Sequence, residues 1–350
     1  MKFVTLIVLF CSTLLTAQNI PLYVGTFTNE NSEGIYSYSF NTKTGEISNE
    51  KLVAKIENPS FISFSSDKKF MYAVNRDSKN EFANAFSVSN NGDLNLINKV
   101  GSNGKGPCHV QLNKSNTKLV VSNYGGGTIS LYDINKNGSL NEAFQVLDHN
   151  LPEDKSRAHS AKFLKNSLFI ADLGRDFLAH YNENKNLFKL KENYKMKDGA
   201  GPRHFEISKK GKYIYVINEL NATVSVLKKT KKTYTNIQDI STLRADYSGK
   251  NSCADIHLSK NEQFLYGSNR GENSIVVFKR NKKDGTLEKI QSISVHGDWP
   301  RNFSLSPDGN FMLVANRKSN NISVYNVNKI SGKLSFLQSF ESKTPVCLLF

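Results

Sequence analysis

The strongest constraint on the fold is a sequence unit that recurs about every 48 residues. Each unit has an apolar stretch, a polar turn, a second apolar stretch ending in Asn or Asp, another turn, and a third stretch rich in Val, Ile, Ser and Tyr. The residues that end the second stretch lie 46 to 51 positions apart: Asn75, Asn123, Asp172, Asn218, Asn269 and Asn316. Thr26 takes the same place 49 positions before Asn75, which makes seven units. They leave no boundary for a second domain.

Each unit predicts four short strands. Alternating apolar and β-branched residues, bounded by Gly, Asn, Asp and Lys, are strand signals. A glycine recurs in the turn before the predicted fourth strand, where it takes a positive φ at little cost. No helical periodicity of useful length is present, and four-stranded repeats of this period are typical of propeller blades. We therefore expect an all-β fold, one seven-bladed β-propeller domain with four-stranded blades over residues 18–350.

The two ends of the chain predict how the ring closes. The first unit lacks the stretch that should precede Leu22, while residues 344–350 stand alone after the last unit. Pro345 follows Pro300 by 45 positions, close to the repeat length. We expect this C-terminal stretch to pair beside the strand near Tyr23 as the first strand of the first blade, which leaves no exposed sheet edge.

Residues 1–17 predict a signal peptide. Lys2 precedes an apolar run over residues 3–15, and the small residue Ala17 stands before Gln18. The run is shorter than the about 20 residues that a membrane span needs, so an uncleaved anchor is the weaker alternative. We expect cleavage after Ala17 and an exported protein, periplasmic or secreted, with no integral membrane segment after the signal. The remaining cysteines, Cys108, Cys253 and Cys347, cannot all pair and are expected to be small buried residues.

The charge balance is strongly basic. Lys and Arg total 46 against 31 Asp and Glu, a formal net charge of +15. Such a balance is compatible with nucleic acid, acidic surfaces or an anionic small molecule as partner. Export and the absence of any nucleic-acid motif exclude nucleic acid as the expected partner. Many lysines lie in turns, which predicts a solvated basic surface.

Two columns of residues are expected at one mouth of the channel, because the first strand of each blade lines it and the second runs antiparallel. The first column is Phe61, His109, His159, His204, Asp255, Asn302 and Cys347. The second is Phe27, Arg76, Tyr124, Leu173, Glu219, Arg270 and Arg317, and Arg203 and Arg301 stand beside the first. Three of the seven histidines fall in one column, which indicates a functional site, although strand-capping histidines are the alternative.

The residue types at this mouth point to an anionic ligand. A planar guanidinium group binds carboxylate or phosphate at two points. His159, His204 and Asp255 could converge on a metal, but Arg203 beside them argues against a bound cation, so neither a metal nor a cofactor is expected. Four members of the first column are predicted to bind substrate: His109, His204, Asp255 and Asn302.

Residues 22–350 resemble the 6-phosphogluconolactonase/3-carboxymuconate cyclase family of seven-bladed propellers, the lactonase family. The motifs that carry the resemblance include "GPCHVQL" with "VSNYGGGTISLY", "AHSAKF" with "ADLGRDFLAHY", "GAGPRHFEI" with "YVINELNATVSV", and "ADIHLS" with "YGSNRGENSIVVF". The resemblance implies a reaction at a cyclic ester and assigns catalysis to His159, Arg203, Glu219 and Arg270. Predicted export leaves open whether the substrate carries a phosphate, since the phosphorylated lactone is made in the cytosol.

Three functions remain in competition at this stage. The first, which we expect, is a lactonase that hydrolyses a cyclic ester of a sugar acid, so the expected partner is a small anionic or sugar-derived lactone. Its base, His159 or Glu219, activates water while arginines stabilise the oxyanion. The second is a carboxymuconate-type cycloisomerase, in which a carboxylate attacks an alkene within one molecule. The third is a non-catalytic secreted propeller that binds a partner or glycan.

Overall fold

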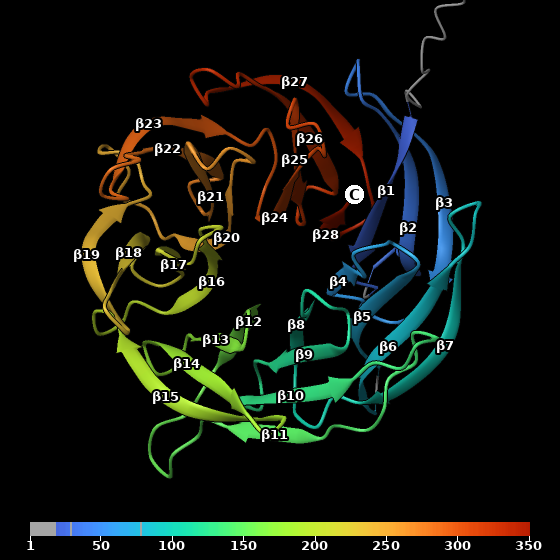
Figure 1. Cartoon of the computed structure of the whole chain (residues 1–350). Helices are drawn as coiled ribbons and strands as arrows, with labels where there is room; N and C mark the ends of the chain where they lie inside the picture. Colours follow the sequence, from blue (N-terminus) through green and yellow to red (C-terminus); the bar gives the residue numbers. More distant parts are fainter. Residues whose placement is uncertain (1–18, 29, 78) are drawn as a thin grey trace, which may run out of the picture.

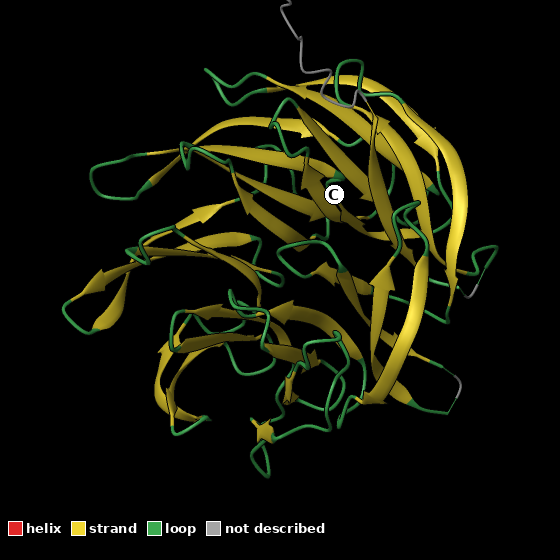
Figure 2. Ribbon diagram, turned by 45° about the vertical axis from the view of Figure 1, so that its right-hand side comes forward, coloured by secondary structure: helices red, strands yellow, loops and turns green. Residues whose placement is uncertain are grey.

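The computed structural model describes residues 19–28, 30–77 and 79–350, so the predicted leader at residues 1–17 lies outside the described residues. Seven four-stranded antiparallel sheets surround a central channel (Figure 1). The described residues form strands, turns and loops without a helix (Figure 2), and thus no helix among them is long and apolar enough to cross a membrane. The predicted seven-bladed β-propeller is confirmed.

The blades follow one another along the chain. In the description of each blade below, the strand given first is the one at the channel. Blade 1 is β28 (Pro345–Leu349), β1 (Asn19–Thr26), β2 (Gly34–Asn41) and β3 (Ile47–Lys55). Blade 2 is β4 (Phe61–Phe64), β5 (Phe70–Arg76), β6 (Glu81–Val88) and β7 (Leu94–Gly101). Blade 3 is β8 (Pro107–Leu112), β9 (Lys118–Asn123), β10 (Thr128–Asp133) and β11 (Gln145–Asp148). Blade 4 is β12 (Ala158–Leu164), β13 (Ser167–Asp172), β14 (Phe177–Asn184) and β15 (Leu187–Lys195).

The second half of the ring repeats this pattern. Blade 5 is β16 (Pro202–Ile207), β17 (Tyr213–Asn218), β18 (Thr223–Thr230) and β19 (Thr233–Ser241). Blade 6 is β20 (Ser252–Leu258), β21 (Phe264–Arg270), β22 (Ser274–Arg280) and β23 (Leu287–Ser294). Blade 7 is β24 (Pro300–Leu305), β25 (Phe311–Asn316), β26 (Asn321–Val327) and β27 (Leu334–Glu341).

The ring closes through the C-terminal strand. β28 pairs antiparallel with β1, with Leu349 opposite Tyr23 and Cys347 opposite Gly25. Val346, Cys347 and Leu348 are buried, so this strand also completes the core beside its neighbours. The predicted closure is confirmed.

The recurring Asn of the sequence repeat joins four of the blades to the chain segment that enters them. Asn123 Nδ2 donates to the carbonyl of Ser102 at 2.9 Å, and Asn316 Nδ2 donates to that of Val295 at 3.2 Å. Asn75 and Asn269 make the same bond to Glu57 and Thr242. These side chains are buried, where an unpaired backbone carbonyl is costly, which explains why an amide recurs at this point of most units.

The recurring glycine of the turn before the fourth strand joins neighbouring blades. The Tyr72 hydroxyl donates to the Gly138 carbonyl of the next blade at 2.9 Å, and Tyr215 does the same to Gly285. Gly138 and Gly285 have φ of 85° and 84°, and a Cβ on either would lie 2.2 Å from an aromatic ring of the preceding blade. Glycine is therefore required both for the turn and for the packing.

Because successive strands of a blade run in opposite directions, their connecting loops lie on two opposite faces of the propeller. Loops from second to third strands and connections between blades lie on one face, which we call the mouth face. Turns from first to second and from third to fourth strands lie on the opposite face. Channel strands begin at the mouth face, so this face contains both predicted columns of site residues.

Candidate active site

An irregularity at the start of the channel strands determines which residues face the mouth. In β16, Pro202 lies opposite Asn218 and His204 opposite Ile217, which leaves Arg203 as the extra residue of a bulge. The same shift occurs in β8, β12 and β24. A bulge redirects a side chain that a regular strand would point elsewhere.

The bulge corrects one expectation from the sequence. In β12, Ala158 lies opposite Asp172 and Ser160 opposite Ala171, so His159 is the extra residue. The prediction that His159 shares a column with His109 and His204 is therefore wrong, because Ser160 holds that place. The extra residues of the four bulges form a row of their own: Cys108, His159, Arg203 and Arg301.

This row opens onto a cavity of about 310 Å³ at the mouth of the channel. All four residues predicted to be catalytic line it, and none of the four predicted to bind substrate does. Blades 4, 5 and 6 supply His159, Arg203 with Glu219, and Arg270 in turn. The full lining is Phe27, Asn58, Ser60, Arg76, Gly106, Pro107, Cys108, Tyr124, His159, Arg203, Glu219, Arg270 and Arg301.

Two buried arginines share one carboxylate in this cavity. Arg203 Nε lies 2.9 Å and Arg270 Nη2 2.8 Å from Glu219 Oε2, while Ser252 Oγ donates to Oε1 at 3.0 Å. Burial works against ionisation of Glu219, but the charges of Arg203 and Arg270 hold its pKa below the ordinary value of 4.5. Glu219 is thus an anion at neutral pH, with both oxygens engaged.

Backbone carbonyls of β20 fix the two guanidinium groups. Arg203 Nη1 donates to Ala254 O at 2.5 Å, and Arg270 Nη2 donates to Cys253 O at 2.7 Å. Arg270 Nε also donates to Ser252 O at 3.1 Å. These bonds hold both charged groups in place before any ligand arrives, which is the arrangement that stabilises developing negative charge most effectively.

His159 is a buried, neutral imidazole at the wall of the cavity. Its ring centre lies 5.1 Å from that of His204 and 5.5 Å from that of Tyr124. Burial, and then the charge of Arg203, lower the pKa of His159 well below its ordinary value of 6.5. Its Nδ1 has no hydrogen-bond partner among the described residues. The ring is therefore held neutral, with an unpaired Nδ1.

Arg301 adds a positive charge that the sequence placed beside the first column without assigning it a catalytic or binding role. It makes no ion pair within the described part of the chain, and its guanidinium lies 5.3 Å from the ring centre of Phe27. Burial, and then the charges of Arg203 and Arg270, lower the pKa of Arg301 to about 9. With Arg76, four arginines thus line the cavity against one carboxylate, an excess of positive charge that favours an anionic ligand.

A signal for Arg301 was present in the sequence. "PRN" at Pro300 repeats the "PRH" at Pro202 at the same place in the blade, so the register that exposes Arg203 also exposes Arg301. Ser252, which supports Glu219, gave no such signal. Of the three free cysteines, Cys253 and Cys347 are buried as expected, whereas Cys108 is partly exposed at the cavity wall.

The residues predicted to bind substrate lie together in the channel beneath the cavity. His204 Nδ1 lies 2.7 Å from Asp255 Oδ1, and Asn302 Nδ2 donates to Asp255 Oδ2 at 2.6 Å. The His109 ring centre lies 5.6 Å from that of His204. These four residues bond and pack among themselves, and their predicted contact with substrate stays a prediction. Within the described ranges, no three His, Cys, Asp or Glu side chains form a metal-binding group.

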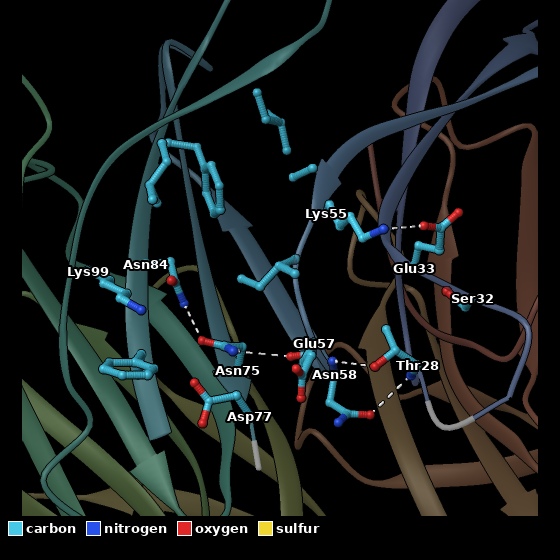
Figure 3. Close-up of a pocket in the computed structure, with 16 residues that line it drawn as sticks. Thr28, Ser32, Glu33, Lys55, Glu57, Asn58, Asn75, Asp77, Asn84 and Lys99 are labelled. Carbon is cyan, nitrogen blue, oxygen red and sulfur yellow. Dashed lines mark hydrogen bonds and ion pairs between the residues drawn. The ribbon is translucent and has the colours of Figure 1, made fainter. Parts of the chain in front are cut away.

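A larger hollow of about 820 Å³ lies beside the cavity, between blades 1 and 2 (Figure 3). Its polar side chains bond one another: Asn84 Nδ2 donates to Asn75 Oδ1 at 2.7 Å, and the Thr28 backbone donates to Asn58 Oδ1 at 3.0 Å. No arginine or histidine lines it. Because the larger hollow has neither the arginines nor the histidine of the smaller cavity, the smaller cavity is the stronger candidate for chemistry.

Comparison with known proteins agrees with this geometry. The family described as "Lactonase, 7-bladed beta-propeller" matches residues 21–350. A 6-phosphogluconolactonase of Formosa agariphila is 37% identical over 307 residues, covering 82% of this chain and 87% of the relative. One of Bacillus subtilis is 30% identical over 295 residues, covering 81% and 84%. The structure of a periplasmic gluconolactonase of Pseudomonas aeruginosa superposes with a TM-score of 0.88 at 28% identity, covering 94% of this chain and 98% of that one. The chain belongs to the lactonase family of seven-bladed β-propellers.

Proposed function

We propose that the protein hydrolyses the lactone of a sugar acid in the cavity of His159, Arg203, Glu219 and Arg270. The observation that carries this proposal is the pair of arginines, fixed by one carboxylate and by backbone carbonyls, beside a neutral histidine whose Nδ1 has no hydrogen-bond partner among the described residues. Relatives named 6-phosphogluconolactonase and gluconolactonase support a sugar-acid lactone as substrate. A carboxymuconate-type cycloisomerase and a non-catalytic binding propeller are not favoured.

The proposed reaction places the lactone carbonyl at Arg203 and Arg270. His159 removes a proton from a water molecule as the water oxygen attacks the carbonyl carbon. The arginines stabilise the negative charge that develops on the carbonyl oxygen. When this intermediate collapses, the bond from the carbonyl carbon to the ring oxygen breaks, and the ring oxygen takes the proton from His159. The product is the open hydroxy acid.

His159 is a better candidate for the base than Glu219. Both oxygens of Glu219 are already engaged, since Oε1 accepts a hydrogen bond from Ser252 and Oε2 lies within ion-pair distance of the two arginines. Loss of that carboxylate would release the arginines, so we assign Glu219 to positioning them. His159 is neutral and its Nδ1 lacks a partner in the described structure, which leaves it able to accept a proton.

The test measures hydrolysis of δ-gluconolactone and of its 6-phosphate. We expect turnover of at least one of them, and His159→Ala should lower kcat by about 10²-fold with the melting temperature unchanged. Glu219→Gln should also lower kcat. Its activity should still fall on acidification, because that fall reflects protonation of His159. A wild-type protein that hydrolyses neither lactone contradicts the proposal, and turnover of a muconate instead would support the cycloisomerase.

A further inference from the structure

We propose that the face opposite the cavity binds an anionic lipid surface. We call it the basic face: the turns that join first to second and third to fourth strands of the blades. These turns contain 17 Lys, no Arg and seven Asp or Glu, an excess of ten positive charges. The loops and connections of the mouth face contain 11 Lys or Arg and 12 Asp or Glu. Of the formal net charge of +15, ten positive charges therefore lie on the basic face, whereas the loops of the mouth face are nearly neutral.

The lysines of the basic face are available to a partner. All 17 are exposed. Among the described residues only one of them, Lys69, lies within ion-pair distance of an acidic side chain, at 4.0 Å from Asp67. Asp67 itself accepts a bond from Ser65 in its own turn, as Asp308 does from Ser306. The acidic residues of the turns thus shape the turns and leave most of the lysine charge uncompensated.

The arrangement favours a flat partner over a linear one. Every blade supplies at least one lysine to the basic face, with the turns arranged in a ring around the channel (Figure 1). A lipid surface can meet turns of all seven blades at once, whereas a single polysaccharide chain crosses only a few. The 17 lysines of the basic face are Lys43, Lys68, Lys69, Lys114, Lys136, Lys165, Lys185, Lys209, Lys210, Lys212, Lys231, Lys232, Lys260, Lys282, Lys283, Lys329 and Lys333.

The chemistry of these side chains also suits lipid headgroups. Lysine is a point charge on a flexible stem that requires no fixed geometry from its partner, and basic residues near an anionic membrane surface each add to its attraction. Ile330, 92% exposed, stands between Lys329 and Lys333 on the same face. An apolar side chain among lysines fits the boundary between headgroups and acyl chains.

Binding through the basic face would leave the cavity open. The cavity lies on the mouth face, at the other end of the channel, so a membrane-bound molecule presents it to the aqueous phase. The inference depends on the charge distribution alone and does not require that the protein be a lactonase.

The experiment is co-sedimentation of residues 18–350 with vesicles of equal parts phosphatidylglycerol and phosphatidylcholine, and with vesicles of phosphatidylcholine alone. We expect binding to the anionic vesicles only, lost at high salt. The test variant replaces Lys210, Lys231, Lys232 and Lys283 by Glu, positions whose side chains make no hydrogen bond or ion pair with other described residues. It should bind at least tenfold more weakly.

The matched control replaces four exposed lysines of the mouth face, Lys79, Lys105, Lys155 and Lys250, by Glu. It has the same net charge as the test variant and should keep vesicle binding within about threefold. Thermal unfolding checks that both variants fold, and the corresponding Gln variants replace any that do not.

Three results would overturn the proposal. They are no binding to anionic vesicles at low salt, equal weakening by the test and control variants, and binding to the acidic polysaccharide alginate without binding to vesicles. Ile330→Ser further distinguishes a lipid surface from a polysaccharide as the ligand, because it should weaken vesicle binding and leave any alginate binding unchanged. An Ile330→Ser variant that binds vesicles like wild type would contradict the placement of this face at the lipid boundary.

Discussion

At the scale of single residues, the unpaired charge of Arg301 leads to a prediction about substrate choice. Arg301 lines the cavity and has no acidic partner within the described ranges, so its guanidinium is free to bind an anionic group. Arg301→Met should raise KM for the phosphorylated lactone about tenfold or more, because two-point recognition of the anion is lost. KM for neutral δ-gluconolactone should stay nearly constant. Steady-state kinetics with both substrates decides, and equal effects on the two would contradict this role.

The same variant should change the pH dependence. Arg301 is one of the charges that lower the pKa of His159. A neutral His159 is required, so activity is lost as pH falls through its pKa, which in the wild type lies well below 6.5. Removing Arg301 raises this pKa, so Arg301→Met should lose activity at a higher pH on acidification. A pH profile of kcat/KM with the acid limb unmoved would show that Arg301 does not act on His159.

Residue positions were predictable from the sequence only as far as strand register was regular. Arg203, Glu219 and Arg270 were expected at one mouth, and they meet there within 2.9 Å. His159 reaches the same cavity, as Arg203 does, through a bulge at the start of its strand, but the sequence prediction counted His159 as a member of the first column. An extra residue in a strand leaves no mark in an alternating pattern, so the sequence placed His159 in the wrong column.

At the scale of turns, the glycines between third and fourth strands should be irreplaceable. Gly285 has φ of 84°, and a Cβ there would lie 2.2 Å from the ring of Tyr213. Gly285→Ala should cost about 1–2 kcal/mol for the left-handed backbone and about 1–3 kcal/mol for the overpacking. Gly199→Ala is the matched control, since Gly199 has φ of 73° with nothing within 4 Å of its Cβ. Chemical unfolding should show a clearly larger loss for Gly285→Ala, and equal losses would exclude the packing argument.

The closing strand gives a second prediction at this scale. Deleting residues 344–350 leaves the β1 edge unpaired and uncovers the core beside Val346 and Leu348. We expect severe destabilisation, seen as loss of the cooperative thermal transition or of soluble protein. Deleting Phe350 alone keeps every pair between β1 and β28 and should have a small effect. A truncated protein that melts like wild type would contradict closure by this strand.

The elements themselves were largely visible in the sequence. Alternation and recurring turn residues predicted four strands per unit, and the orphan C-terminal stretch predicted the closing pair, because both features repeat with the blade. The blade-to-blade bonds of Tyr215 with Gly285 were not predictable, since they depend on the distance between blades.

At the scale of the whole molecule, charge is the property that the sequence described least well. The sequence gives a net charge of +15 and lysines in turns, but only the order of strands within each blade assigns those turns to one face. Arginines cluster around the cavity and lysines around the opposite face. The two groups therefore serve different purposes: precise contact with a small anion at the mouth, and diffuse attraction on the other side.

We propose that the protein is exported, on the basis of the basic start, the apolar run and Ala17. Because β1 begins at Asn19, cleavage after Ala17 leaves every described strand intact. A chain that begins at Gln18 should therefore melt like the full-length chain, in contrast to the chain that lacks residues 344–350. N-terminal sequencing of the protein from its native host should give Gln18 or a neighbouring residue in material recovered outside the cytoplasm. Recovery of intact Met1 from the soluble cytoplasm would contradict export, and it would favour the phosphorylated lactone as substrate, because that compound is made there.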